Sequence, residues 1–307
     1  MKAVVPGVLT LFLLACADVG PSPQQISDHL AAVEEWRASR LDNLTAEYGW
    51  LSLVGLEWLE EGVNRCGASP EAEVELPAGK APEQLALIHF SEQLAELEVL
   101  PEGAGLIVDG APLEAGQRLA LASDAEGEPS MIEWQALQFF LIERGGRIGM
   151  RVKDRQSATR LEFAGIEHFP VSYDWRFDAT FEPYDPPRTV QVPSILGNID
   201  NEESHGAVVF EHDGETHRLD IIGTADESLF LVIGDPTNGH DTYGGGRFLY
   251  APVPDADGRL ELDFNRAYNP PCAFTAFSTC PLPPRQNKLP FDLLAGERYS
   301  GDGDHGA

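Results

Sequence analysis

The sequence is poor in basic residues. Among 307 residues, 21 are lysine or arginine against 50 aspartate or glutamate, which gives a net charge of −29 at pH 7. Such a charge repels phosphate backbones and anionic lipid headgroups. We therefore expect no nucleic-acid partner, and we interpret the acidity as a solubility feature rather than as a device that steers a cationic ligand.

The sequence also lacks the short motifs of the easily recognised enzyme classes. It contains no G-x-S-x-G, no H-E-x-x-H and no Walker loop, which removes the hydrolases, zincins and P-loop enzymes that these motifs identify. His212 and His217 flank the Asp213-Gly214 turn, where we expect exposed histidines rather than a metal site. No cofactor and no metal is predicted, and the residues do not decide whether the protein is an enzyme.

Long apolar runs are scarce, and the one that stands out is N-terminal. Residues 1–16, MKAVVPGVLTLFLLAC, contain one lysine and an apolar run that is shorter than the roughly 20 residues needed to span a bilayer. This is typical of a signal peptide. The end of the run, LLAC, resembles the bacterial lipobox, in which cleavage leaves Cys16 as a lipidated N-terminus. We predict an exported protein of the cell envelope, anchored by lipid to a bacterial membrane and on its periplasmic face if the cell is Gram-negative.

A linker and one helix are predicted after the anchor. Residues 17–25 are small and polar and contain proline, as linkers do. Residues 26–47 have the periodicity of an amphipathic helix. The apolar stripe expected to dock on the rest of the protein consists of Ile26, Leu30, Val33, Trp36 or Arg37, Leu41 and Leu44.

The rest of the chain alternates apolar and polar residues with period two, which predicts strands. Asp109-Gly110, Gly145-Gly146, Asp213-Gly214 and Asp257-Gly258 separate such runs and supply the positive φ of tight hairpins. We predict a mostly β, antiparallel fold. It comprises the N-terminal helix, a sandwich-like part over residues 48–160, a C-terminal sheet or barrel over residues 161–299 and a disordered tail over residues 300–307.

Two segments of the C-terminal part concentrate polar side chains, residues 234–250 (GDPTNGHDTYGGGRFLY) and residues 263–287 (DFNRAYNPPCAFTAFSTCPLPPRQN). Alternation places Asp263 and Asn265 together on one face of a predicted strand. We expect the two segments to meet at one end of the C-terminal part. The candidate ligand-binding residues are Asp235, Thr237, Tyr243, Arg247, Asp263, Asn265, Tyr268 and Asn269.

Three functions are compatible with these segments. In the leading hypothesis they form a pocket for a small polar ligand. The alternative is an enzyme with hydrolase-like acid–base chemistry that uses Asp263 or His240. A further alternative is a structural envelope lipoprotein, in which the polar side chains hydrogen-bond to their own loops.

Cysteine is rare, with four residues in the chain. Cys272 and Cys280 lie eight residues apart, and a disulfide is our first interpretation for an exported protein. Closing so short a loop would contribute about 2–3 kcal/mol. Paired buried thiols, a metal site and a catalytic thiol are the alternatives. Cys66 is left over and is expected to be a small buried residue.

Several segments resemble a known family. Residues 181–193 (FEPYDPPRTVQVP), 233–250 and 263–290 look like the hallmark segments of a bacterial and archaeal family, domain-of-unknown-function family 1684. Residues 49–64 (GWLSLVGLEWLEEGVN) also fit, so that the resemblance extends from Trp36 to Tyr299. It implies that the eight candidate residues, Cys272 and Cys280 occupy hallmark positions, and it implies no particular activity.

The first part also resembles forkhead-associated (FHA) β-sandwich domains, through residues 59–77 (LEEGVNRCGASPEAEVELP) and 106–121 (LIVDGAPLEAGQRLAL). In that family an arginine that grips phosphate follows the glycine found here as Gly67. Ala68 occupies this position, and the following AGKAPEQLA lacks the family's Ser-x-x-His element. The resemblance thus implies a sandwich scaffold without phosphothreonine binding.

Overall fold

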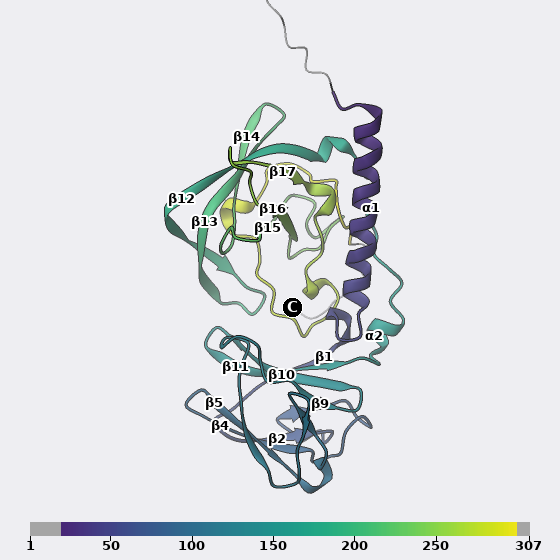
Figure 1. Cartoon of the computed structure of the whole chain (residues 1–307), viewed down its shortest axis with the longest axis vertical. Helices are drawn as coiled ribbons and strands as arrows, with labels where there is room; N and C mark the ends of the chain where they lie inside the picture. The colour runs from purple at the N-terminus through teal and green to yellow at the C-terminus, as the bar shows by residue number, and fades with distance from the viewer. Residues whose placement is uncertain (1–19, 300–307) are drawn as a thin grey trace, which may run out of the picture.

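The computed structural model describes residues 20–299 of the chain; the expected signal peptide with Cys16, the first three residues of the predicted linker and the C-terminal tail lie outside these residues. The fold is mostly β with an N-terminal helix, as predicted, and its sheets are almost entirely antiparallel (Figure 1). Within the described residues, no helix is both long and apolar enough to cross a bilayer.

Helix α1 (Pro23–Thr45) begins three residues earlier than predicted. Ser22 caps it: the Ser22 side chain accepts a hydrogen bond from the Gln25 N–H, and the Gln25 side chain accepts one from the Ser22 N–H. This capping box satisfies two amides that the helix itself leaves without partners.

The face of α1 that docks on the protein differs from the predicted stripe. Ile26, Leu30 and Leu41 are 37–39% exposed, so their assignment to the docking face was wrong. The helix is held partly by polar contacts, which a hydrophobic period does not reveal. Buried or half-buried side chains on the docking face are His29, Val33, Trp36, Arg37, Arg40 and Leu44.

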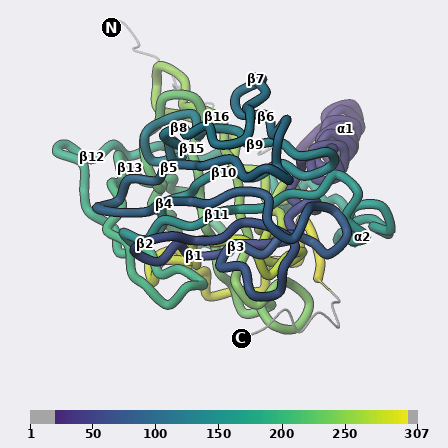
Figure 2. The backbone as a smooth tube through the Cα atoms, turned by 90° about the horizontal axis from the view of Figure 1, so that it is seen from below, coloured from purple at the N-terminus to yellow at the C-terminus, as the bar shows by residue number. Residues whose placement is uncertain are grey.

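Two sheets form a β-sandwich below α1 (Figures 1 and 2). One sheet has the order β1 (Leu53–Trp58), β11 (Arg147–Asp154), β10 (Leu137–Arg144), β9 (Ile132–Trp134), β6 (Ile107–Val108) and β7 (Ala111–Pro112). The other has the order β3 (Val74–Glu75), β2 (Gly62–Gly67), β4 (Ala86–Ser91), β5 (Leu94–Val99) and β8 (Arg118–Leu121). Only the short β2–β3 pair is parallel among the strands of the described residues.

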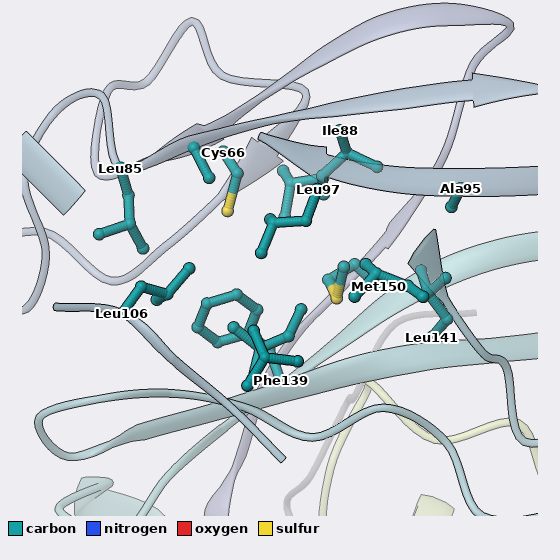
Figure 3. Close-up of a cluster of buried hydrophobic side chains, with 14 of the residues drawn as sticks. Cys66, Leu85, Ile88, Ala95, Leu97, Leu106, Phe139, Leu141 and Met150 are labelled. Carbon is teal, nitrogen blue, oxygen red and sulfur yellow. The ribbon is translucent and has the colours of Figure 1, made fainter. Parts of the chain in front are cut away.

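Apolar side chains from both sheets fill the sandwich (Figure 3). Phe139 of β10 and Met150 of β11 meet Ile88 of β4 and Leu97 of β5, and each of these side chains is inaccessible to solvent. Cys66 lies in the same core, where burial raises the pKa of its thiol to about 12. A thiol in this environment stays protonated and inert at physiological pH.

Three of the predicted hairpin turns have positive φ at both residues: Asp109-Gly110 between β6 and β7, Gly145-Gly146 between β10 and β11, and Asp213-Gly214 between β13 and β14. At Asp257-Gly258 only the glycine has positive φ. The β4–β5 turn uses Glu92 and Gln93, both with positive φ, and no Gly or Asn announced it in the sequence.

The C-terminal part contains a four-stranded sheet in the order β14 (Glu215–Asp220), β13 (Ile199–His212), β12 (Arg176–Pro193) and β17 (Arg259–Asp263). The long strands β12 and β13 curve around one side of this part (Figure 1). A two-stranded sheet, β15 (Ser228–Ile233) and β16 (Arg247–Pro252), packs inside the curve. The core between them includes Phe210, Leu231, Leu249, Leu262 and Phe264.

The last 36 described residues contain no named strand. They follow β17 through the 3-10 turns η4 (Phe264–Arg266), η5 (Pro271–Ala273) and η6 (Arg285–Asn287). Gly296 has φ +76, and a Cβ at this position would collide with the carbonyl oxygen of Ala267. The C-terminal segment can therefore pass this close to the residue after η4 only because position 296 is a glycine. The remaining short elements are η1 (Trp50–Ser52), η2 (Pro101–Gly103), α2 (Ala158–Leu161) and η3 (Tyr173–Trp175).

His212 and His217 are not freely exposed, so that prediction was wrong. The C-terminal segment folds over the β13–β14 hairpin and brings Phe291 against both histidines, with ring centroids 4.4 Å and 5.0 Å apart. The His212 side chain keeps 20% of its accessible surface. The turn between the two residues was identified correctly, but the residues that cover it come from a distant part of the chain.

Candidate functional site

Asp235, Thr237 and Arg247 form one buried network. The Arg247 Nη2 donates to Asp235 Oδ2 at 2.9 Å and to the Leu293 carbonyl oxygen at 2.8 Å. The other Asp235 oxygen, Oδ1, accepts from the Thr237 N–H at 3.0 Å and from the Leu293 N–H at 3.1 Å. These bonds tie β16 and the loop after β15 to the C-terminal segment, so the network fastens the fold.

Asp263 and Asn265 form a second buried group, together with His29 of α1. Strand β17 ends at Asp263 rather than continuing through Asn265 as alternation predicted, because Asp263 caps η4 and accepts hydrogen bonds from the Asn265 N–H at 3.0 Å and Nδ2 at 2.8 Å. Its other oxygen, Oδ2, lies 3.0 Å from His29 Nε2. Asn265 is anchored in turn to both the N–H and the carbonyl of Ser172.

Asn269 belongs to a third group, centred on the buried Glu297. Glu297 Oε2 accepts from the Asn269 N–H at 2.7 Å, and Oε1 accepts from Arg40 Nε at 3.0 Å. Burial raises the pKa of Glu297, and the Arg40 guanidinium opposes this rise. Arg40 also donates to the Asn269 carbonyl at 2.9 Å, so that α1 is bonded to the loop after η4.

The polar candidate residues therefore do not converge on one pocket. Within residues 20–299, no hydrogen bond or ion pair joins Asp263 or Asn265 to Asp235, Tyr243 or Arg247. The two loops do meet, because Gly234 pairs with Lys288 and contacts Pro283, but backbone and proline mediate the contact. Their polar side chains hydrogen-bond to backbone groups that have no strand partner, as expected if these segments have a structural role.

Two further candidate residues lie apart from these networks. His240 and Asp241 are exposed in the loop after β15, and His240 contacts none of the other candidates through its side chain within the described residues. Tyr243 packs edge-on against Tyr299, with ring centroids 5.3 Å apart. Neither arrangement provides a base next to an open substrate pocket.

Tyr268 alone among the eight candidates lines an aromatic pocket. This cavity of about 390 Å³ is lined by residues of α1, η1 and the β15–β16 sheet. Trp50 and Tyr250 are 38% and 53% exposed in its walls. A larger groove of about 830 Å³ on the sandwich is lined by none of the candidate residues. The residues lining the aromatic pocket are Trp36, Ser39, Arg40, Asn43, Trp50, Phe230, Phe248, Tyr250, Tyr268 and Pro271.

Strand register builds the aromatic wall of this pocket. Phe230 of β15 pairs directly with Tyr250 of β16, and the two rings stack 4.9 Å apart at 30°. Phe248, two residues before Tyr250, shares its face of the strand and meets Tyr268 edge-on at 5.8 Å. Tyr250 and Tyr268 stack at 6.3 Å, with 16° between the ring planes.

Helix α1 provides the opposite, more polar wall. Ser39 and Asn43 are exposed and one helical turn apart, so both side chains reach the same rim. Arg40 lies over the Tyr268 ring, 4.6 Å from its centroid. Burial raises the pKa of both Tyr250 and Tyr268, so both phenols stay neutral and able to donate hydrogen bonds at physiological pH.

The cysteine pair supports the same region. Cys272 and Cys280 form a disulfide in the structure, with their Cα atoms 6.2 Å apart. Both are buried against Val232 and Phe248, which share their face of the sheet with the Phe230 and Tyr250 rings of the aromatic wall. Since Pro271 lines the pocket and precedes Cys272, the disulfide holds one edge of the pocket in place.

Sequence reasoning missed most of the pocket. A signal was present, because Phe230 and Val232 on one strand and Phe248 and Tyr250 on the next are spaced by two and so share a face. Nothing local to Trp36 or Trp50 indicated that they would join this face, since the two tryptophans lie about 200 residues away in the sequence.

Comparisons with known proteins follow the division of the chain. Residues 161–298 match the model of a family described as protein of unknown function (DUF1684). The solution NMR structure of an uncharacterized protein of Haloarcula marismortui is 33% identical over 47% of this chain and 81% of that chain, with a TM-score of 0.39. No curated protein matches the sequence significantly.

Two FHA-domain structures are also similar to part of the chain. The FhaA FHA domain, crystallised with the intracellular domain of a second protein, is 22% identical over 31% of this chain and 96% of that chain, with a TM-score of 0.22. A structure described as a structural and functional analysis of phosphothreonine-dependent FHA domain interactions is 22% identical over 32% of this chain and 92% of that chain, with a TM-score of 0.22.

The family match begins at residue 161, where the sandwich has ended and the C-terminal part begins. It contains β12 to β17, the disulfide loop and all eight candidate residues. Residues 49–64, which also fitted the resemblance, lie outside it. Through its C-terminal part, residues 161–298, the chain belongs to the DUF1684 family of proteins of unknown function.

Proposed function

We propose that the protein is an exported, lipid-anchored binding protein that takes a saccharide into the aromatic pocket. The observation that carries this proposal is the pairing of an aromatic wall with a polar rim across one cavity of about 390 Å³. A sugar ring has the same two-sided character, with C–H groups on its faces and hydroxyls around its edge. Aromatic rings bury the faces, while hydroxyl, amide and guanidinium groups bind the edge.

The exposure of the aromatic rings supports a ligand rather than a core. Trp50 and Tyr250 remain 38% and 53% accessible although they adjoin a buried cluster. Large aromatic surfaces left open beside polar groups mark binding sites on soluble proteins. The disulfide and the Arg40–Glu297 pair hold the surrounding backbone, so the pocket is formed before a ligand arrives.

The cell envelope as the place of action is part of the proposal and is supported by residues 1–16. A signal peptide that ends in LLAC would deliver the protein to an oxidising compartment and attach it by lipid at Cys16. The disulfide between Cys272 and Cys280 is stable in such a compartment. Labelling cells with an alkyne-bearing fatty acid tests the anchor, because Cys16→Ala should abolish incorporation of the label.

Binding is tested with a glycan array and then by calorimetry on the purified protein. We expect one class of saccharide to bind, and Trp50→Ala to weaken it by roughly fivefold or more, on the scale of the about 1–3 kcal/mol lost when an aromatic ring that stacks on a nucleic-acid base is removed. Tyr250→Ala should have a similar effect.

The matched control is Trp58→Ala, measured with an uncharged saccharide as the ligand. Both tryptophans are partly exposed and lie beneath an arginine, Trp50 under Arg151 at 5.5 Å and Trp58 under Arg147 at 4.4 Å, but only Trp50 lines the pocket. Equal losses from the two substitutions, or an array with no bound saccharide, would contradict the proposal.

A second candidate function is acid–base catalysis, and the His29–Asp263 pair favours it. His29 lines a separate cavity of about 270 Å³ together with Tyr173, Arg176 and Arg266. A histidine held by a carboxylate, itself held by an amide, is the arrangement of an oriented general base. A screen of esters, glycosides and phosphoesters separates the two functions. Turnover that His29→Gln abolishes and Trp50→Ala leaves intact supports catalysis, and saccharide binding without turnover supports the binding protein.

A further inference from the structure

One face of strand β11 carries a stripe of three cations. Ile148, Met150 and Val152 point into the sandwich core, so Arg147, Arg151 and Lys153 lie on the opposite face. This sheet lies on the side of the sandwich nearer the C-terminal part (Figure 1), and Arg151 Nη2 donates to Thr279 Oγ1 of that part at 3.2 Å. We call Arg147, Arg151 and Lys153 the basic stripe.

Within the described part of the chain, no carboxylate forms an ion pair with the basic stripe, although Asp124 acts on Arg151 from a greater distance and Lys153 donates a hydrogen bond to the Tyr48 carbonyl. Among residues 20–299, none of its three side chains forms an ion pair with an acid. Each instead lies over an aromatic ring, Arg147 over Trp58 at 4.4 Å, Arg151 over Trp50 at 5.5 Å and Lys153 over Phe140 at 5.6 Å. In a chain with 50 acidic and 21 basic residues, three adjacent cations without an acidic partner are unexpected.

Arg151, in the middle of the basic stripe, is buried and only partly hydrogen-bonded. It is 4% exposed, and its Nε has no hydrogen-bond partner. Burial lowers the pKa of Arg151 to about 10, so that it is still a cation at pH 7. The neighbouring Arg144 lowers this pKa further, and the more distant Asp124 opposes the effect without forming an ion pair. A buried guanidinium with an empty donor and no ion-paired carboxylate is destabilising on its own, and an anion that binds there would reduce this penalty.

The basic stripe and the aromatic pocket share Trp50. This ring lies beneath Arg151 and at the same time forms a wall of the pocket. From Arg147 to Lys153 the stripe is about 20 Å long, at roughly 3.3 Å per strand residue. A ligand that occupies both features is therefore longer than one sugar ring and carries negative charge along part of its length.

We infer that the ligand is an acidic oligosaccharide, one of whose rings stacks in the aromatic pocket while its carboxylates bind to the basic stripe. This inference rests on the proposed saccharide binding and adds the charge of the ligand. Guanidinium groups bind carboxylates through paired, charge-assisted hydrogen bonds, which neutral sugars cannot form. The acidic surface elsewhere repels the same ligand, so binding is confined to the stripe.

The test uses the full-length protein and a matched pair of probes, an oligogalacturonate and its fully methyl-esterified form, with affinity measured by calorimetry. The two probes share their rings and linkages and differ in the carboxylate charge. We expect the acid to bind at least tenfold more tightly than the ester. Arg147→Gln, at the exposed end of the stripe, should reduce this difference and leave binding of the ester unchanged.

Arg188→Gln is the control, because Arg188 also lies over an aromatic ring, 3.8 Å from the Tyr184 centroid, but belongs to β12 and not to the stripe. It should not alter either affinity. Equal affinity for acid and ester, or binding of neutral glycans alone, overturns the acidic ligand and leaves the proposed function standing. Failure of every saccharide to bind overturns both.

Discussion

At the scale of single residues, the polar side chains that dominate the C-terminal sequence act mainly on their own backbone. Asp235, Arg247, Asp263, Asn265 and Asn269 are all buried, and each bonds to main-chain groups of segments that lack strand partners. A long stretch without sheet hydrogen bonds must satisfy its N–H and C=O groups in another way. The density of Asp, Asn and Arg in these loops is explained by that requirement.

Removing Asp235 should be far more damaging than removing its exposed neighbour in the same loop. Asp235→Ala leaves Arg247 buried without a counter-charge, and we expect a loss of about 3–5 kcal/mol of unfolding free energy. Asp241→Ala breaks only an exposed pair with Arg298, at 3.5 Å, and should cost about 1 kcal/mol or less. Urea unfolding of both variants measures the difference, and similar losses would show that the buried pair is not what holds the loop.

His168 should make the protein less stable in mild acid. Burial lowers the pKa of His168 to about 4 from 6.5, and the nearby Arg37 adds to this effect. Between these values the unfolded chain binds a proton and the folded chain does not, so the stability that the neutral histidine contributes is present above pH 6.5 and is lost as the pH falls toward 4. The fall in unfolding free energy from pH 7 to pH 4.5 should be smaller in His168→Gln. If the unfolding free energies of the native protein and of His168→Gln depended on pH in the same way, the lowered pKa of His168 would be contradicted.

At the scale of elements, α1 shows how polar contacts override a hydrophobic period. The predicted stripe contained Ile26, Leu30 and Leu41, all of which are more than a third exposed. His29 and Arg40 lie on the buried side because they pair there with Asp263 and Glu297, respectively. The helix is rotated relative to the orientation that its apolar residues alone would favour.

This rotation predicts opposite outcomes for two leucines of α1. Leu44→Ala should lower the unfolding free energy by about 2–5 kcal/mol, because Leu44 is inaccessible to solvent and its removal leaves a cavity. Leu30→Ala should change it by about 0.5 kcal/mol or less, because that side chain is 39% exposed. Thermal unfolding of the two variants measures these losses. A large loss of stability in Leu30→Ala would mean that Leu30 is buried, as the sequence pattern predicted.

At the scale of the whole molecule, residues 20–299 build two large hydrophobic cores and a smaller cluster around the disulfide. One lies within the sandwich and the other between the curved sheet and β15–β16. The seam between these parts is polar and aromatic, with Arg151, Thr279 and Trp50 at its centre. Both proposed binding features, the aromatic pocket and the basic stripe, lie along this seam, where Trp50 and Arg147 are exposed and Arg151 is buried.

Two cores joined by a seam of this kind should unfold in two calorimetric transitions. Phe139→Ala removes a ring from the sandwich core and should lower one transition, while Phe264→Ala should lower the other, each by about 3–5 kcal/mol. Differential scanning calorimetry measures both. A single transition shifted equally by the two variants would mean that the parts unfold as one unit.

Much of the architecture followed from local patterns. Period-two alternation and the turn pairs Asp109-Gly110, Gly145-Gly146 and Asp213-Gly214 predicted an antiparallel β fold, and this is confirmed. These signals are local, because a strand's alternation and a hairpin's φ angles depend on neighbours within a few residues. The family resemblance is also a local signal, because its hallmark segments within residues 181–290 are continuous stretches of sequence.

The sequence by itself thus determined the fold class, the family of the C-terminal part and the segments where polar residues gather. Only the tertiary structure decided that these residues pair with one another, that His29 reaches Asp263, and that Trp36 and Trp50 complete an aromatic wall begun by Phe230 and Tyr250. The physical reason is distance along the chain. Contacts between residues from 180 (Trp50 and Phe230) to 234 (His29 and Asp263) positions apart depend on how whole elements pack, and no periodicity or local propensity encodes that packing.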